Sequence, residues 1–422
     1  MYKRCKLDNG LRIVSHRMDN RASLSLGIWV NAGGRYEDSE NKGISHFLEH
    51  LLFKGTKNYS CRKLKESIEG VGGSLNGFTS EELTCYLVKI PADYLSLALD
   101  VLSDMVINPS LPAVEIEKEK TVILEEIKMY RDQPQSHVHE LLDELLWPRQ
   151  PLGAPIIGTE GSVKSMGKDD LMDFRKRYYT PANIVISAAG DLNHDDLMRK
   201  ASRIFSKLKP GAKNIFRPAR EMQRMPQLKI LSKDTEQTHM ALGFHALRRD
   251  HPLKHALSLL HIIMGANMSS RLFEEVREER GLAYEIGTAV KRFQDTGAFL
   301  VHAGIDNSKV EKALALILKE LELVKEKLVT EDEFRRAKRF YIGQLKLGLE
   351  DTAENMLWIG ETVATLDRTY SLPEIIEEAS RVSREDLRYA AQRILKEENL
   401  NLALIGPLKG RHGKIEKELS IG

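Results

Sequence analysis

The sequence contains one short motif whose residue types and spacing could bind a metal ion: HFLEH, at residues 46–50. If this segment is helical, His46 and His50 lie one turn apart on the same face, so both imidazoles can reach one ion. Glu49 lies beside them and can accept a proton from a water molecule. The order H-x-x-E-H is the inverted zinc motif, and the alternative is a helix whose histidines only pack or face solvent. The motif therefore predicts a two-histidine metal site with a general base.

Such a site needs a third protein ligand, and an acidic helix further along the chain offers candidates. The helix expected over residues 115–129 carries a stripe at positions 115, 119, 122, 123 and 126, with an apolar centre at Val122 and Ile123. Glu119 and Glu126 then lie on a half-buried face, where a carboxylate is unfavourable unless it is paired or coordinates a metal. We expect Glu126 to be the ligand and Glu119 to support a ligating histidine.

Two alternatives to this assignment remain open from periodicity alone. The stripe could be shifted, so that both glutamates face solvent, or Glu125 could take the ligand role instead of Glu126.

The elements that must position these residues belong to a globular protein. The 422 residues are 42% hydrophobic, 29% charged and 6% aromatic, which excludes disorder, collagen and coiled coil for the whole chain. The formal net charge of +2 gives no strong attraction for nucleic acid or an anionic membrane. Three cysteines without a C-x-x-C pair argue against a disulfide framework. With no signal peptide and no charge-free apolar run long enough to span a bilayer, we expect a cytoplasmic protein without membrane insertion.

The chain also contains an internal repeat that relates its two halves. Four pairs of expected strands recur in the same order: 11–15 with 228–232, 26–28 with 242–244, 87–89 with 300–302, and 184–189 with 400–405. Between the halves lies a polar stretch with three prolines. We therefore predict an N-terminal metal-binding catalytic domain over 1–208, a linker over 209–226, and a homologous C-terminal domain over 227–422.

Each half alternates strands with amphipathic helices, such as those expected over 308–327 and 330–349. The predicted fold is α+β, with two homologous domains of mainly antiparallel sheet, helices on one face of each, and a clam-shell arrangement. An alignment of the halves at Gly55 and Gly265 places Ala256, Leu259 and Leu260 opposite His46, Glu49 and His50. On that alignment the second half has lost the metal ligands, and the active site is a cleft between the halves.

The sequence around the motif resembles the signature of the pitrilysin and mitochondrial processing peptidase family of zinc endopeptidases. The matching residues are Gly43 to Ser45 before the motif and Leu51 to Thr56 after it. The resemblance implies that the third ligand is a glutamate at a characteristic distance beyond the second histidine, which matches Glu126, and that Glu119 is a recurrent family glutamate. It covers nearly the whole chain and is closest to the processing-peptidase-like bacterial branch.

A second segment that matches the family's sequence pattern lies in the C-terminal half, over residues 270–284. The resemblance implies that Arg277 and Tyr284 lie opposite the zinc and engage the substrate. A cation and a phenol can hold a peptide carbonyl and stabilise developing oxyanion charge. Without the resemblance, a surface arginine and a core tyrosine would be the better interpretation.

The segment 72–80, followed by 83–90, is typical of a β-hairpin whose first strand could form a sheet edge. Such an edge can accept an extended peptide as an added strand. Asn76, with its neighbours Gly77 and Phe78, is the candidate substrate-binding segment, and Asn76 matches a family position that binds substrate backbone. A plain packed hairpin is the alternative.

One departure from the family pattern concerns selectivity for basic residues. The resemblance places acidic substrate-binding positions at Ser136 and Glu140, and only Glu140 is acidic here, which puts strict arginine selectivity in doubt. We interpret His137 and His139, in the same segment, as incidental because the three-ligand set is already complete.

Taken together, the residues and the resemblance predict a zinc-dependent endopeptidase, with one Zn²⁺ per chain, that acts on extended peptides or unfolded segments. Other divalent ions could also suit a ligand set of two nitrogens and one oxygen. The alternative is a non-catalytic scaffold or partner subunit of the same fold. The family resemblance implies a homodimer as the default assembly.

Overall fold

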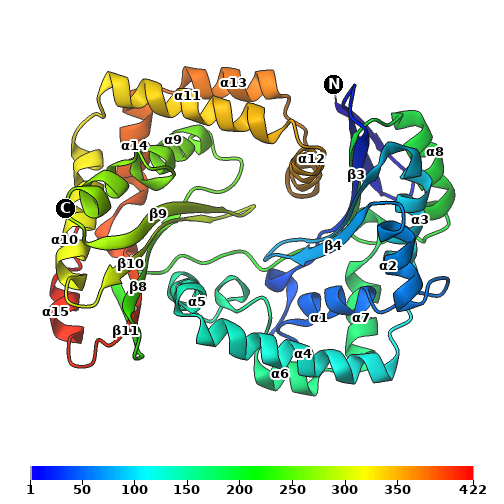
Figure 1. Ribbon diagram of the computed structural model, residues 1–422, viewed down its shortest axis with the longest axis horizontal. Helices are drawn as coiled ribbons and strands as arrows, with labels where there is room; N and C mark the ends of the chain where they lie inside the picture. The colour runs from blue at the N-terminus through cyan, green and yellow to red at the C-terminus, as the bar shows by residue number, and fades with distance from the viewer. Residues whose placement is uncertain (1, 422) are drawn as a thin grey trace. The chain divides into compact units, whose positions relative to one another are not determined.

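The computed structural model describes residues 2–421, which form two compact units (Figure 1). The first unit contains the described residues up to Lys128, together with Ala154–Arg217 and Lys346–Leu372. The second unit contains Met129–Gly153, Pro218–Leu345 and the described residues from Pro373 onward. Neither unit is one continuous stretch of chain.

The first unit is built on a six-stranded sheet with the strand order β1-β2-β6-β3-β5-β4. Only β2 and β6 pair in parallel, and the other neighbours are antiparallel. The strands are β1 (Tyr2–Lys6), β2 (Arg12–Arg17), β3 (Ser23–Val30), β4 (Ser74–Thr79), β5 (Thr84–Pro91) and β6 (Ile184–Gly190).

The second unit repeats this topology in a five-stranded sheet with the order β7-β11-β8-β10-β9. Its one parallel pair, β7 with β11, corresponds to β2 with β6. The strands are β7 (Gln227–Ser232), β8 (Gln237–Ala246), β9 (Ala283–Arg292), β10 (Gly297–Asp306) and β11 (Asn401–Gly406). The predicted α+β fold with two similar, mainly antiparallel sheets is therefore confirmed.

The helices follow the strands in the same order in both halves of the sequence. The first half contains α1 (Ile44–Leu52), α2 (Cys61–Glu69), α3 (Leu95–Ile107), α4 (Ala113–Asp132), α5 (Pro134–Leu146), α6 (Glu160–Ser165), α7 (Lys168–Tyr178) and α8 (His194–Phe205). The second half contains α9 (Lys254–Gly265), the π-helical segment η5 (Phe273–Glu278), α10 (Val310–Glu326), α11 (Glu331–Gly348), α12 (Thr352–Leu366), α13 (Leu372–Arg381), α14 (Arg384–Ile394) and α15 (His412–Lys417). By this order α1 corresponds to α9, and α4 corresponds to α11.

Each sheet has the predicted layer of helices on one face, and one further helix covers its opposite face. In the first unit this helix is α12, which comes from the second half of the sequence and packs on β2, β3 and β6 (Figure 1). Ile359 and Val363 of α12 are buried with Trp29 and Val185 of the sheet. A Cβ atom on Gly360 would lie 2.1 Å from the Trp29 indole nitrogen, so only glycine permits this close approach.

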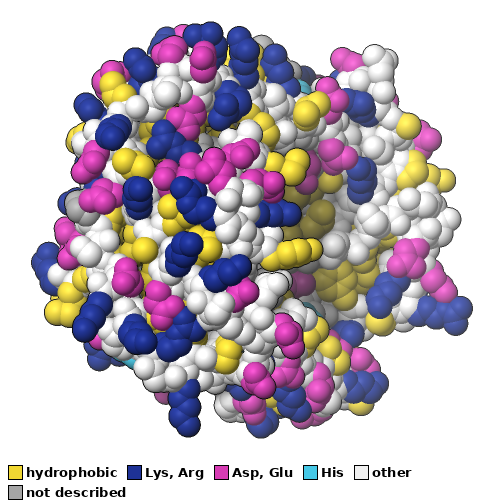
Figure 2. All heavy atoms as spheres, turned by 60° about the vertical axis from the view of Figure 1, so that its left-hand side comes forward, with side chains coloured by type: hydrophobic (Ala, Val, Ile, Leu, Met, Phe, Trp, Pro, Cys, Tyr) yellow, Lys and Arg dark blue, Asp and Glu magenta, His cyan; other side chains and the backbone are white. Residues whose placement is uncertain are grey.

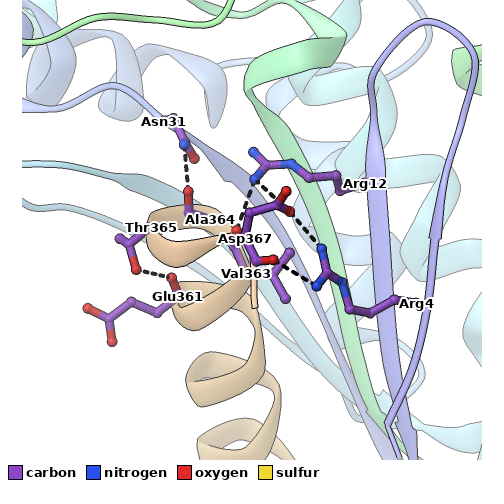
Figure 3. A network of polar contacts seen from close by, with 8 residues as sticks. All are labelled: Arg4, Arg12, Asn31, Glu361, Val363, Ala364, Thr365 and Asp367. Atoms are coloured by element: carbon purple, nitrogen blue, oxygen red, sulfur yellow. Dashed lines mark hydrogen bonds and ion pairs between the residues drawn. The ribbon is translucent and has the colours of Figure 1, made fainter. Parts of the chain in front are cut away.

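Polar contacts at the C-terminal end of α12 fix it to the sheet, as Figure 3 shows. Arg12 donates to the Val363 carbonyl at 2.9 Å, and Asn31 donates to the Ala364 carbonyl at 2.7 Å. Both carbonyl groups belong to the last turn of the helix, and the Val363 carbonyl also accepts the backbone N–H of Asp367 at 3.1 Å. Arg4 pairs with Asp367, just beyond the helix end, at 2.6 Å. The C-terminal end of α12 is therefore held by β1, β2 and the residue that follows β3 through specific contacts as well as by apolar packing.

The second sheet has a matching arrangement, because α5 comes from the first half of the sequence and packs on β8 and β11. Leu142 of α5 is fully buried with Leu300 and Ala403 of the sheet. A glycine again lies under the helix, since a Cβ atom on Gly243 would be 3.0 Å from a methyl carbon of Leu142. Each half of the sequence thus contributes one helix that packs on the sheet of the other half.

On the face shown in Figure 2, Lys and Arg side chains are interspersed with Asp and Glu side chains. This mixture is consistent with the formal net charge of +2 for the whole chain. Among residues 2–421, no helix combines the length and the apolarity that crossing a membrane requires.

Candidate metal centre

Helix α1 of the first unit presents both histidines of the motif on one side. Its apolar side chains Phe47, Leu48 and Leu51 are fully buried in the core of the unit. His46 and His50 are only half-buried, and their ring centroids lie 4.5 Å apart. The motif is therefore helical, and burial of its apolar face orients the two imidazoles in the same direction.

The N-terminus of α1 is fixed by a carboxylate that precedes the helix. The helix follows Gly43, whose φ of 88° lies in the left-handed region and which has no side chain to cap the helix. Glu37 takes this role, since it accepts hydrogen bonds from the backbone N–H groups of Gly43 at 2.7 Å and Ser45 at 2.9 Å. Burial raises the pKa of Glu37 to about 7.

Glu126 of α4 lies beside the two histidines. Its Oε2 atom is 3.9 Å from His46 Nε2 and 3.7 Å from His50 Nε2. The three possible ligand atoms all lie within 4.8 Å of one another, and this is the one such group found among the described residues. Tetrahedral ligand atoms about 2.0–2.1 Å from Zn²⁺ lie roughly 3.3–3.4 Å apart, so a small contraction would complete the geometry.

The electrostatics of the cluster also favour a cation. Burial, with His50 as a second cause, lowers the pKa of His46 to about 3, so this imidazole is neutral and can donate a lone pair near pH 7. Burial raises the pKa of the Glu126 carboxyl group. A divalent ion would favour its ionised form and replace the solvation that burial removes. The residues present therefore fit a zinc ion.

Glu119 orients His50 from the opposite side. Its Oε2 atom lies 3.1 Å from His50 Nδ1, and its other oxygen pairs with Lys54 Nζ at 2.6 Å. When His50 Nδ1–H donates to this carboxylate, the lone pair is left on Nε2, the nitrogen nearest Glu126. Glu119 is buried, so Lys54 supplies the opposite charge that a buried carboxylate needs.

Glu49, on the same helix, is buried and accepts a hydrogen bond from the Thr79 hydroxyl at 3.0 Å. Burial raises the pKa of the Glu49 carboxyl group, and the bond from Thr79 opposes that shift. One carboxylate oxygen is thus held by β4, which fixes the orientation of the other.

The structure corrects the predicted stripe on α4. Val122 is 48% exposed, whereas Ile116, Glu119, Ile123 and Ile127 form the buried face. The apolar centre is displaced because α4 packs through the positions three and four residues apart around Ile123. Glu126 still lies at the border of that face. Glu125, the alternative ligand, points to solvent and pairs with Lys128 at 2.7 Å.

The candidate substrate-binding segment lies on β4, which pairs with β5 alone and forms one edge of the first sheet. Asn76 is exposed, and its side-chain oxygen accepts a hydrogen bond from the Gly77 N–H at 2.8 Å. Gly77 lies against Phe53, since a Cβ atom there would be 3.0 Å from the ring. Phe78 packs edge-to-face on Trp29. The strand that carries Thr79 therefore also presents an unpaired edge.

Arg277 and Tyr284 lie in the second unit, close to each other. The guanidinium carbon of Arg277 is 5.9 Å from the Tyr284 ring centroid and 4.6 Å from that of Phe273. Arg277 lies in the π-helical segment η5, and π-helical turns are frequent at functional sites. Tyr284 is 75% exposed on β9, the edge strand of its sheet. Both side chains are therefore accessible.

Glu140 lies on α5, partly covered, and burial raises the pKa of its carboxyl group. Ser136 is on the same helix. His137 and His139 are also on α5 and are not part of the group that could hold a metal among residues 2–421. His139 instead lies 5.9 Å from His302 of the second sheet.

Three residues that shape the site were missed by the sequence analysis: Glu37, Lys54 and Thr79. Each acts through a contact with a residue distant in sequence or through a backbone group. Strand alternation could have indicated Thr79, because it shares a face of β4 with Gly77. No comparable pattern in the sequence pointed to Glu37 or Lys54.

Family models match most of the chain. Residues 12–160 match a model described as insulinase, peptidase family M16, and residues 165–341 match the peptidase M16 inactive domain. The chain is similar to the uncharacterized zinc protease YmxG of Bacillus subtilis, with 36% identity over 409 residues. That alignment covers 96% of this chain and 98% of the relative.

Solved structures show the same fold at lower identity. A protease from Helicobacter pylori superposes with a TM-score of 0.90 at 22% identity, covering 96% of this chain and 99% of that one. A chain of complex III from Candida albicans superposes with a TM-score of 0.86 at 20% identity, covering 99% of this chain and all of that one. At these identities the likeness extends to the fold alone.

Proposed function

The chain belongs to peptidase family M16, and we propose on this basis that it is a zinc-dependent endopeptidase that hydrolyses peptide bonds in extended peptides or unfolded segments. The observation that carries the proposal is the group formed by His46, His50 and Glu126, with Glu49 on the same helix. Relatives that are named zinc proteases support the metal and the reaction class.

In this proposal, His46 and His50 hold one Zn²⁺ through Nε2, and Glu126 holds it through a carboxylate oxygen. When bound, the ion supplies Lewis acidity and lowers the pKa of water towards neutrality. Glu119 keeps the proton of His50 on Nδ1, so that Nε2 remains free to bind the ion.

Glu49 is the general base. Its carboxylate accepts the proton of the attacking water and then delivers it to the leaving amine. Thr79 holds one oxygen of Glu49, so the other is directed to the proton that it must accept. Burial of Glu49 shields this contact from solvent.

We propose that the substrate adds as a strand to the edge of β4, where Asn76, Gly77 and Phe78 offer unpaired backbone groups. Arg277 and Tyr284 engage the substrate carbonyl, and Glu140 contributes a weaker preference for a basic residue. The accessibility of Arg277 and Tyr284 supports their part in this proposal.

We propose that residues 1–208 and 227–422 are two copies of one duplicated unit joined by the linker 209–226, with α5 and α12 exchanged between the folded units. We also propose that the protein is a cytoplasmic homodimer. Cysteines without a disulfide among the described residues support a reducing compartment.

The alternative function is a non-catalytic scaffold, since a chain of complex III has the same fold. A scaffold needs neither a neutral His46 nor a buried general base. The intact group of His46, His50 and Glu126 therefore favours the peptidase.

Metal analysis of the purified protein, with peptide-library cleavage in the presence and absence of a chelator, tests the proposal. We expect about one zinc ion per chain and cleavage that the chelator abolishes and added zinc restores. Glu49→Gln should keep the metal but lower turnover by about 10²–10⁴-fold, because the amide cannot accept a proton. Zinc-loaded protein that cleaves no peptide in the library would favour the scaffold instead.

A further inference from the structure

The second unit contains a pocket in the place that corresponds to the metal centre of the first. It lies between α9 and α11, which correspond in order to α1 and α4, and its volume is ≈ 500 Å³. This size is within the range of small-molecule sites. Its polar lining comes from the basic residues Lys254 and Arg292, from His255 and His261, from the hydroxyl groups of Ser258 and Tyr341, and from the amide of Gln344.

The lining of the pocket is basic, whereas the metal centre is rich in carboxylates. None of the residues that line the pocket is acidic. Glu378, outside the lining, pairs with Lys254 Nζ at 2.8 Å and lies 2.9 Å from His255 Nε2, so it balances part of the positive charge. A metal cation would be repelled by Lys254 and Arg292, whereas an anion would be attracted.

The polar groups of the pocket are held in place by one another. Arg292 donates to the Ser258 hydroxyl at 2.8 Å, and the Tyr341 hydroxyl lies 3.1 Å from His255 Nδ1. His261 Nδ1 contacts the Thr288 hydroxyl at 2.7 Å. Donors that are fixed before a ligand arrives lose little conformational freedom on binding.

The two imidazoles of the pocket are buried, and burial favours their neutral form. Burial, followed by the positive charge of Arg292, lowers the pKa of His261 to about 4. Burial also lowers the pKa of His255, and its contact with Glu378 opposes that shift. Both rings are therefore neutral near pH 7 and add no charge to the pocket.

We propose that this pocket binds a small oxyanion, a carboxylate or phosphate group, with Arg292 and Lys254 as the charged donors. The planar guanidinium of Arg292 suits two oxygens of such a group, and the Lys254 ammonium can donate to a third. The oxyanion could be free in solution or could be the C-terminal carboxylate of a peptide. The pocket is independent of the metal centre, so its ligand can be measured whether or not the protein cleaves peptides.

Titration calorimetry of the full-length protein with inorganic phosphate, at constant ionic strength, tests the pocket. We expect saturable binding that weakens about 10-fold or more in Arg292→Gln, because a charge-assisted hydrogen bond is lost. Lys254→Gln serves as the second variant if Arg292→Gln does not fold, and thermal melting checks both. The matched control is Arg381→Gln on α13, whose side chain is 73% exposed and outside the pocket.

A second arm distinguishes the two sources of the anion. Two peptides that differ only in a free or amidated C-terminus are titrated into Glu49→Gln protein, in which cleavage is suppressed if the proposed function holds. Preference for the free carboxylate, lost in Arg292→Gln, would assign the pocket to peptide C-termini, and phosphate binding without such a preference would assign it to a free oxyanion. The proposal is overturned if neither ligand binds saturably up to about 10 mM, or if the pocket variants bind as the control does.

Discussion

The space between α1 and α4 in the first unit and the space between α9 and α11 in the second occupy the same position in two copies of one topology. The first is lined by two histidines and by Glu119 and Glu126, with Lys54 as a counter-charge. The second is lined by lysine, arginine, histidine and hydroxyl groups. A duplicated fold thus keeps its layers and strand order, while the side chains between two corresponding helices change the ion that the space can attract.

The comparison also shows which residues of α9 face the pocket. Ala256, Leu259 and Leu260, which the sequence placed opposite the motif, are buried in or against the core of the second unit. The face of α9 that lines the pocket carries Lys254, Ser258 and His261.

Removal of a proposed metal ligand from the first unit tests the difference between the two spaces most directly. His50→Ala should lose the metal, and hydrolysis should fall at least as far as on loss of the general base, by about 10²–10⁴-fold. Metal analysis and hydrolysis of a quenched fluorescent peptide measure both. His412→Ala, an exposed histidine on α15, is the control and should keep both. Full zinc content in His50→Ala would refute the assignment.

Tyr284→Phe asks whether the second unit takes part in the reaction although it contains no metal group among its described residues. Turnover should fall by about 10²–10³-fold, the effect of losing one oxyanion donor, with zinc content unchanged. Steady-state kinetics and metal analysis give the two readouts. Tyr389→Phe, another exposed tyrosine of the second unit, should have no effect. Zinc loss in Tyr284→Phe would show that this residue supports the fold or the metal instead.

Two adjacent glutamates on α4 allow a matched test of the third ligand. Glu126→Gln should weaken zinc binding by at least about 10- to 100-fold, since even groups that only support a ligand have effects of this size. Glu125→Gln removes the same charge at an exposed position and should leave zinc affinity unchanged. Competition with a chromogenic chelator measures both affinities. The opposite result would identify Glu125 as the ligand.

The smallest expected effect concerns the contact between β4 and the general base. Thr79→Val keeps the shape of the side chain but removes the hydrogen bond to Glu49, so kcat should fall about 10-fold with little change in KM or zinc content. Thr79→Ser keeps the hydroxyl and should restore most of the rate. If both variants fall equally, the contribution of Thr79 is packing and the hydrogen bond has no role.

Much of the fold followed from local patterns. All eight strands that the repeat paired are present, and the helices expected over 308–327 and 330–349 occur as Val310–Glu326 and Glu331–Gly348. The hairpin of β4 and β5 was also predicted, with its first strand at a sheet edge. These features depend on periodicity and turn chemistry within short segments, which a single sequence contains.

The candidate site was predicted in part for the same reason. The spacing of His46 and His50 fixes their separation once the segment is helical, so the pair needed no tertiary information. The choice between Glu125 and Glu126 as the third ligand did need tertiary information. Adjacent helical positions differ by about 100° in direction, and an error of one position in the stripe exchanges the buried and the solvent-facing glutamate.

The sequence by itself determined the eight strands of the repeat, the β4–β5 hairpin, the helices over 310–326 and 331–348 and the two-histidine motif, because each is encoded in residues close together in the chain. Only the tertiary structure decided that α12 covers the first sheet and α5 the second, that Glu126 approaches the histidines, and that Thr79 and Glu37 fix α1 and its base. These are contacts between residues far apart in the chain. They depend on which apolar faces pack together, and an amphipathic pattern shows that a face is buried without showing what buries it.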